Sequence, residues 1–240
     1  MSQRFESLQP PRRFYTEVDM APADRGFGVR LDGRALRTPM AHPLVLPSEA
    51  LARLVAAEWA DQGERIVMAA MPATRLAHTA IDAVPLARPE TAAGVAGFAA
   101  ADLVCYFAPG PASLRARQEE VWGPLLAWAR SDLGLAFERG EGVVHRDQPA
   151  ATLAKVEALA ARRADFPLAG LAFAAQLFGS AILALALERG RLDGNQAFAA
   201  SRIDETFQSG QWGEDAEAAA QARALQAEAL MLGHWFAALR

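Results

Sequence analysis

The sequence has little of what most catalytic and metal-binding sites are built from. Cys105 is the one cysteine among 240 residues, which excludes an internal disulfide and a multi-cysteine metal site and is typical of a reducing compartment. The four histidines, His42, His78, His145 and His234, lack the paired spacing of a zinc site. We therefore interpret each histidine first as a structural residue.

Sequence signatures of nucleotide-binding and nucleophilic enzymes are also missing. Gly26-Phe27-Gly28 lacks the third glycine of a phosphate loop, and Lys155, the one lysine, has no such loop nearby. Ser180 lies in an apolar run instead of a nucleophile elbow. Some acidic residues could form a carboxylate pair for acid–base work, but a sequence does not give their separation: Asp82, Asp102, Glu119 and Glu120.

From these absences we expect no catalytic residue, no cofactor and no metal. One alternative stays open, a small cytoplasmic enzyme with a carboxylate or histidine site in a cleft between the two halves of the chain.

The net charge of −4 and the pI near 5.6 argue against nucleic acid as a partner, because phosphate binding requires clustered positive charge. The hydrophobic content of 52% is sufficient for a substantial core.

One segment, Leu168–Leu187, is uncharged over the length of a membrane span. Gly170, Gln176 and Ser180 make it weakly apolar, and no aromatic belt or basic cluster flanks it. We expect a helix buried on all sides in a bundle and no stable membrane insertion, with a helix that anchors the protein in a membrane as the alternative. No signal peptide is visible in residues 1–13, so we expect a bacterial cytoplasmic protein.

The pattern along the chain predicts an α+β protein, a small β-containing N-terminal domain followed by a mainly helical bundle. We predict boundaries at 1–62, 63–147 and 148–240, for a β-rich domain with a closing helix, a mixed joining segment and the bundle. Asp32-Gly33 predicts a hairpin turn, since a two-residue turn needs positive φ. Other strands are expected at 14–18, 26–31, 35–38, 44–46 and 103–106, with a last extended piece at 137–145.

Helices are expected wherever apolar residues recur at a period of 3.6. In the first 147 residues they fall at 48–62, where Trp59 lies on the inner face, and at 73–82, 90–101 and 115–132. In the remainder they fall at 150–164, 168–188, 193–212 and 216–239.

A mixed polar, acidic and aromatic patch is expected at the end of the 193–212 helix. On a continuous helix, one stripe of residues would pack in the core: Ala199, Ile203 and Phe207. A neighbouring stripe would be polar: Ser201, Glu205, Gln208 and Trp212. We predict that partner binding uses Glu205, Gln208, Trp212, Glu214 and Asp215, because aromatic residues ringed by polar ones are typical of interface centres. The alternative is that Trp212 fills a helix junction and the carboxylates cap helices.

An ordered set of short motifs along nearly the whole chain carries a family resemblance. The motifs are Arg13-Phe-Tyr15, Asp32-Gly-Arg34 with Thr38-Pro39, Pro43-Leu-Val-Leu46, Glu58-Trp59 with Gln62-Gly63, Met71-Pro72 with Thr74-Arg-Leu-Ala77, Thr79-Ala-Ile-Asp82, Asp102-Leu103 with Cys105-Tyr106, Arg117-Gln118, Glu141-Gly142, Gly179-Ser180, and Ser201-Arg202 with Asp204-Glu205, Gln208 and Gln211-Trp-Gly-Glu-Asp215. The set resembles the assembly chaperone for the alpha subunit of the F-type ATP synthase catalytic sector, known in mitochondria as assembly factor 2.

The resemblance implies a non-enzymatic function. Members of that family bind the free alpha subunit, shield the surface destined for the beta subunit, and release it when the catalytic hexamer assembles. The expected partner is therefore the alpha subunit, and the expected state of this chain is a monomer. The resemblance implies the mitochondrial matrix for eukaryotic relatives, whereas the absence of a visible presequence leads us to expect a bacterial cytoplasmic location here.

Overall fold

The computed structural model describes residues 9–142, 144–212 and 216–240 and confirms the α+β class. The chain divides into two compact units, Met1–His78 and Thr79–Arg240. The three expected domain boundaries stay a prediction.

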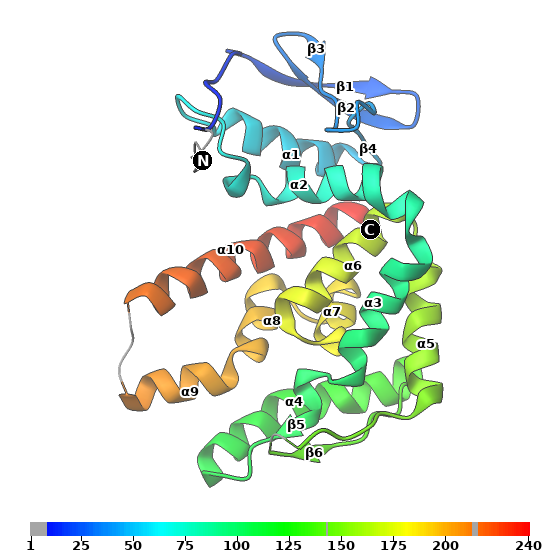
Figure 1. The fold of residues 1–240 in the computed structure, drawn as a ribbon, viewed down its shortest axis with the longest axis vertical. Helices are drawn as coiled ribbons and strands as arrows, with labels where there is room; N and C mark the ends of the chain where they lie inside the picture. Colours follow the sequence, from blue (N-terminus) through cyan, green and yellow to red (C-terminus); the bar gives the residue numbers. More distant parts are fainter. Residues whose placement is uncertain (1–8, 143, 213–215) are drawn as a thin grey trace, which may run out of the picture. The chain divides into compact units, whose positions relative to one another are not determined.

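The first unit is a small antiparallel sheet covered by a helix. Strands β1 (Val18–Ala23), β3 (Arg34–Ala35) and β4 (Val45–Leu46) all pair with the central strand β2 (Gly26–Leu31). The turn from β2 to β3 has φ of 47° at Asp32 and 75° at Gly33, so the predicted hairpin is confirmed. Helix α1 (Glu49–Ala60) contacts β1 and β2, as Figure 1 shows.

Helix α1 begins where the sequence predicted and buries one face. The Ser48 hydroxyl accepts from the Leu51 N–H at 3.1 Å, which satisfies one of the free donors of the first turn. Trp59 is 7% exposed, and the Tyr15 hydroxyl donates to the Trp59 carbonyl at 2.6 Å. The Trp59 indole Nε1 has no hydrogen-bond partner among the described residues, so apolar burial is what holds this ring.

Helix α2 (Pro72–His78) follows a 3₁₀ turn at Met68–Ala70 and is held by Glu58. The Glu58 carboxylate accepts from the backbone N–H groups of Ala73 and Thr74 and from the Thr74 hydroxyl, each at 2.7 Å. The carboxylate thus caps the start of α2, where negative charge is stabilised by the helix dipole. Burial nevertheless raises the pKa of Glu58.

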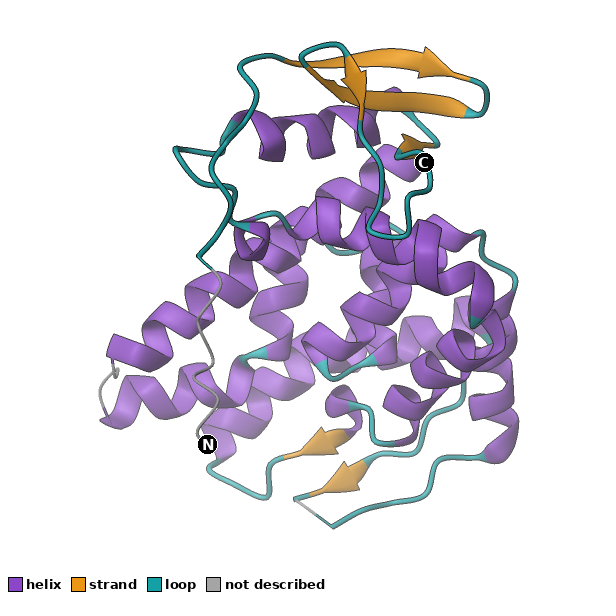
Figure 2. Cartoon of the chain, turned by 45° about the horizontal axis from the view of Figure 1, so that its top comes forward, coloured by secondary structure: helices purple, strands orange, loops and turns teal. Residues whose placement is uncertain are grey.

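The second unit is mainly helical (Figure 2). It opens with one π turn (Thr79–Ala83), one 3₁₀ turn (Val84–Leu86) and α3 (Arg88–Ala100). A 3₁₀ turn (Leu103–Cys105) leads to β5 (Tyr106–Phe107), which pairs in parallel with β6 (Gly140–Glu141) across α4 (Ala112–Leu133). The remaining helices are α5 (Ala150–Ala161), α6 (Asp165–Phe178), α7 (Ala181–Glu188), α8 (Gly194–Ser201), α9 (Ile203–Trp212) and α10 (Ala216–Leu239).

The expected single helix over 168–188 is wrong, because α6 and α7 are separate helices. Gly179 adopts a left-handed φ of 62° and ends α6, and Ser180 then caps α7 by accepting from the Leu183 N–H. The expected burial is confirmed at α7, where every residue from Ala181 to Leu187 is at most 2% exposed. Among the described residues, no helix has the length and apolar character to cross a membrane.

Asp102 fixes the start of α7 from within the core. Its carboxylate is fully buried and accepts from the Ser180 hydroxyl at 2.5 Å and from the Ile182 N–H at 3.0 Å. The Leu103 N–H donates to the Gly179 carbonyl at 3.1 Å beside it. The Ser180 hydroxyl therefore links Asp102 to α7, and does not satisfy a carbonyl of its own helix.

Two expected strands are also wrong. Residues 14–17 precede β1 without joining the sheet, because the Thr16 and Glu17 N–H groups donate to the Asp32 carboxylate. Residues 103–105 form a 3₁₀ turn, because the Asp102 side chain accepts from the Val104 N–H and closes the backbone. In both places an aspartate side chain accepts from backbone N–H groups that a sheet would otherwise use, Asp32 at a distance in sequence and Asp102 locally.

Candidate functional site

The predicted patch lies on two helices instead of one. Helix α8 begins with a capping box between Asp193 and Gln196 and ends at Ser201. Arg202, with φ of −119° and ψ of 22°, leaves the helical conformation, and α9 restarts at Ile203. Because of the break, residues after position 202 point in other directions, relative to those before it, than they would on one continuous helix.

The break also changes which residues face the core. Ala199 is exposed and Ala200 is 2% exposed, so the expected core position of Ala199 is wrong. Ile203 is 2% exposed and Phe207 is half-buried, in agreement with the expected core face of α9. Ser201 is buried and its hydroxyl donates to the Phe198 carbonyl, so it does not share a surface with Glu205.

Helix α9 is attached to α4 by a buried polar bridge. Gln118 is fully buried, and its Nε2 donates to the Asp204 carboxylate at 2.6 Å while its Oε1 accepts from the Ala108 N–H at 2.8 Å. One turn further along α4, the Trp122 Nε1 donates to the Ala200 carbonyl at 2.9 Å. These bonds fix the end of α8 and the start of α9 against α4.

The outer face of α9 carries the described part of the predicted patch. Glu205 and Gln208 are exposed, and the Glu205 carboxylate pairs with Arg202 at 2.9 Å. Trp212 ends α9, but its side chain lies outside the described residues, as do Glu214 and Asp215. The structure therefore brings two of the five predicted residues together on one exposed face, and the patch as a whole stays a prediction.

Three of the acidic and histidine candidates for chemistry are held by other residues. Asp102 is enclosed at the start of α7, where burial raises its pKa to about 7. Glu119 pairs with Arg139 at 2.9 Å, and His145 is exposed beside Asp147 at 3.2 Å. No cluster of metal-ligating side chains occurs in the described ranges.

Cys105 is also unsuited to nucleophilic chemistry. The residue is fully buried, and burial raises the pKa of the thiol. It therefore stays a neutral thiol at physiological pH, when the reactive species would be the thiolate.

Sequence reasoning missed the positioning roles of Gln118 and Glu58. Leu114, Gln118 and Trp122 follow at intervals of four along α4, and all three are buried. A polar residue on an apolar stripe must find partners, and that pattern could have identified Gln118. Glu58 has no comparable signal, because its partners Ala73 and Thr74 belong to another helix.

Comparison with known proteins defines the class. The family model described as ATP12 chaperone protein matches residues 12–130. The crystal structure of Atp12 from Paracoccus denitrificans is 40% identical with a TM-score of 0.87, over 96% of this chain and 99% of that chain. The chain belongs to the ATP12 chaperone family, whose members are ATP synthase assembly chaperones.

Two further solved structures agree with this assignment. A mutant of Paracoccus denitrificans Atp12p is 39% identical with a TM-score of 0.87, over 96% of this chain and 98% of that chain. The Atu1473 protein of Agrobacterium tumefaciens is 39% identical with a TM-score of 0.87, over 96% of this chain and 87% of that chain. Similarity thus extends through both units, beyond the residues that the family model matches.

Proposed function

We propose that this chain binds the free alpha subunit of the F-type ATP synthase, shields its subunit interface from aggregation, and releases it on assembly with the beta subunit. The observation that carries the proposal is membership of the ATP12 chaperone family over 96% of the chain. The bacterial origin of the similar structures supports the bacterial cytoplasm as the place of action.

A chaperone of this kind must cover an apolar surface without becoming a permanent partner. An unpaired subunit exposes an interface that is an aggregation hazard until it is covered. A contact with a small aromatic centre and a polar rim allows release, because the beta subunit can displace the chaperone by burying a larger area. Such an exchange needs no nucleotide hydrolysis by the chaperone.

We assign the contact to the outer face of α9 and the residues that follow it: Glu205, Gln208, Trp212, Glu214 and Asp215. Support comes from the exposure of Glu205 and Gln208 on a helix that Gln118, through Asp204, fixes to α4. A fixed helix loses little conformational freedom on binding, which favours its use as a recognition element. The acidic residues suit a basic rim on the client.

The proposal is tested by co-purification and by aggregation. The tagged chain is expected to recover free alpha subunit from native bacterial lysate, and an equimolar amount should suppress light scattering by purified alpha subunit. Addition of beta subunit should then free the chaperone, as measured by size-exclusion chromatography. Recovery of no alpha subunit, together with no effect on scattering, would refute the proposal.

A further inference from the structure

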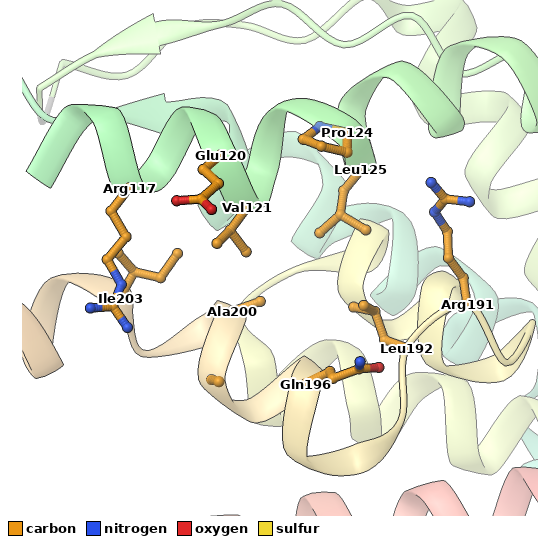
Figure 3. A pocket seen from close by; sticks show the side chains of 11 residues that line it. Arg117, Glu120, Val121, Pro124, Leu125, Arg191, Leu192, Gln196, Ala200 and Ile203 are labelled. Carbon is orange, nitrogen blue, oxygen red and sulfur yellow. The ribbon is translucent and has the colours of Figure 1, made fainter.

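An apolar groove lies between α4 and the segment that runs from the end of α7 to the start of α9 (Figure 3). Its volume is about 600 Å³. Its apolar lining comes from both walls: Val121, Pro124, Leu125, Leu192, Ala200 and Ile203. A volume of this size is in the range of ligand-binding clefts, and it accommodates several side chains.

The floor of the groove is buried and its edge is open. Leu125, Ala200 and Ile203 are at most 3% exposed, so they belong to the packed core. Ala199 also lines the groove and is exposed. An occupant would therefore enter past Ala199 and contact a preformed apolar surface.

Positive charge stands at both ends of the groove. Figure 3 shows Arg117 reaching from α4 toward Ile203 at one end, with Arg191 at the other end beyond Leu192. Arg117 is exposed and makes no ion pair with any described residue. The Arg191 guanidinium lies over the Trp128 ring at 5.6 Å, a contact that leaves its N–H donors available.

Polar groups between the two arginines suit the main chain of a peptide. Glu120 lines the groove from α4 and Gln196 lines it from α8, where the Gln196 Oε1 already accepts from the Asp193 N–H at 2.9 Å. Pro124 has no N–H to donate to the Glu120 carbonyl one turn earlier in α4, so that carbonyl lacks its helical donor. The Glu120 carboxylate and the Gln196 Nε2 therefore place an acceptor and a donor beside the apolar floor.

We propose that this groove binds an apolar segment of the client that carries a carboxylate toward each end. The charges are complementary, because Arg117 and Arg191 would pair with carboxylates toward the ends of the segment. The apolar floor would contact the middle of the segment. The inference rests on the proposed function, because the client is the alpha subunit. It adds a second contact beside the outer face of α9.

The first test fills the groove. Ala199→Trp places a large ring at the open edge, and Ala158→Trp places the same ring on the exposed face of α5 as a control. Affinity for purified alpha subunit is measured by biolayer interferometry, with the melting temperature of each variant as a check on folding. We expect Ala199→Trp to weaken binding at least tenfold and Ala158→Trp to leave it within twofold.

The second test removes the charge and does not depend on how the tryptophan packs. Arg117→Glu should weaken binding about tenfold at low salt and should reduce its salt dependence, whereas Arg162→Glu, another exposed arginine, should do neither. If the parent binds alpha subunit and both groove variants bind equally well, the groove inference is wrong and the proposed function stands. If the parent does not bind alpha subunit, both fail.

Two other occupants would also overturn the inference. If the groove instead binds a second copy of this chain, sedimentation analysis should show a dimer of the parent that Ala199→Trp dissociates. If the groove instead binds a small amphiphilic anion, native mass spectra of the parent should show a bound compound that is lost in Arg117→Glu. The affinity for alpha subunit should then be the same in both proteins.

Discussion

Reversal of the charge at Glu205 separates a binding residue from a structural one. Glu205→Lys removes the 2.9 Å ion pair with Arg202 and puts a cation in the first turn of α9. An exposed pair contributes about 0.2–1 kcal/mol. The unfavourable helix-dipole interaction adds about 0.3–1 kcal/mol. Total destabilisation should therefore be about 0.5–2 kcal/mol, or a decrease in melting temperature of roughly 1–8 °C for a chain of this size.

A contact with a complementary charge on the client would lose considerably more. Truncation or reversal at an interface charge costs about 2–5 kcal/mol when the partner is left unpaired, so affinity for alpha subunit should decrease at least thirtyfold. Calorimetry or circular dichroism would give the melting temperature, and biolayer interferometry the affinity.

Glu49 supplies a matched control. It is an exposed acidic residue in the first turn of α1, and it pairs with Arg53 at 2.7 Å. Glu49→Lys should cost a similar stability and leave the affinity unchanged. If Glu205→Lys and Glu49→Lys bind alpha subunit equally well, Glu205 is not in the binding surface. If Glu205→Lys unfolds the protein, the assignment of Glu205 as an exposed recognition residue is wrong.

Three further predictions concern the core. Trp59→Arg removes a buried ring, at a cost of about 3–5 kcal/mol, and buries a charge. Folded protein should therefore not be recovered. A variant with an unchanged melting temperature would refute the structural role of Trp59. Gln118→Leu leaves the Ala108 N–H without its acceptor and Asp204 without its donor. The free energy of unfolding, measured by urea titration, should therefore decrease by about 1–3 kcal/mol. An unchanged free energy of unfolding would show that this bridge is dispensable. Because burial raises the pKa of Asp102 to about 7, the folded state binds an extra proton between about pH 4 and 7, and the stability of the parent relative to Asp102→Asn should therefore increase as pH falls from 7.5 to 5.5. A stability difference that stays constant over this range would mean that Ser180 and the α7 backbone keep the carboxylate ionised, since the folded and unfolded states would then bind the same number of protons.

The α+β class and most of the helices could be predicted because their signals are local. Ser48 caps α1, Asp32 and Gly33 form the turn, and the apolar period of α10 predicts its observed range, 216–239. In each case the determining residues are close in sequence, and their propensities agree with the final packing. The family resemblance rests on the same ordered local motifs and is confirmed by the comparisons.

Where local signals competed, the outcome depended on partners far along the chain. The uncharged run of 168–187 fits a continuous helix by hydropathy, but Asp102, almost 80 residues earlier, accepts from Ser180 and Ile182 and stabilises the break. The break at Arg202 likewise accompanies contacts of Ala200 and Asp204 with Trp122 and Gln118. A helical period cannot indicate a break when the groups that stabilise it are distant in sequence.

The sequence alone thus determined the class of the fold, the polar character of the 201–215 segment and the family. Only the tertiary structure decided that Ala199 faces outward, that Ser201 is buried away from Glu205, and that α4 and α8 enclose an apolar groove between Arg117 and Arg191. The physical reason is that exposure depends on which surfaces meet, and a small change in helix phase moves every later residue to another face. The amino-acid composition shows which side chains are present, and the tertiary packing determines which of them are exposed to a partner.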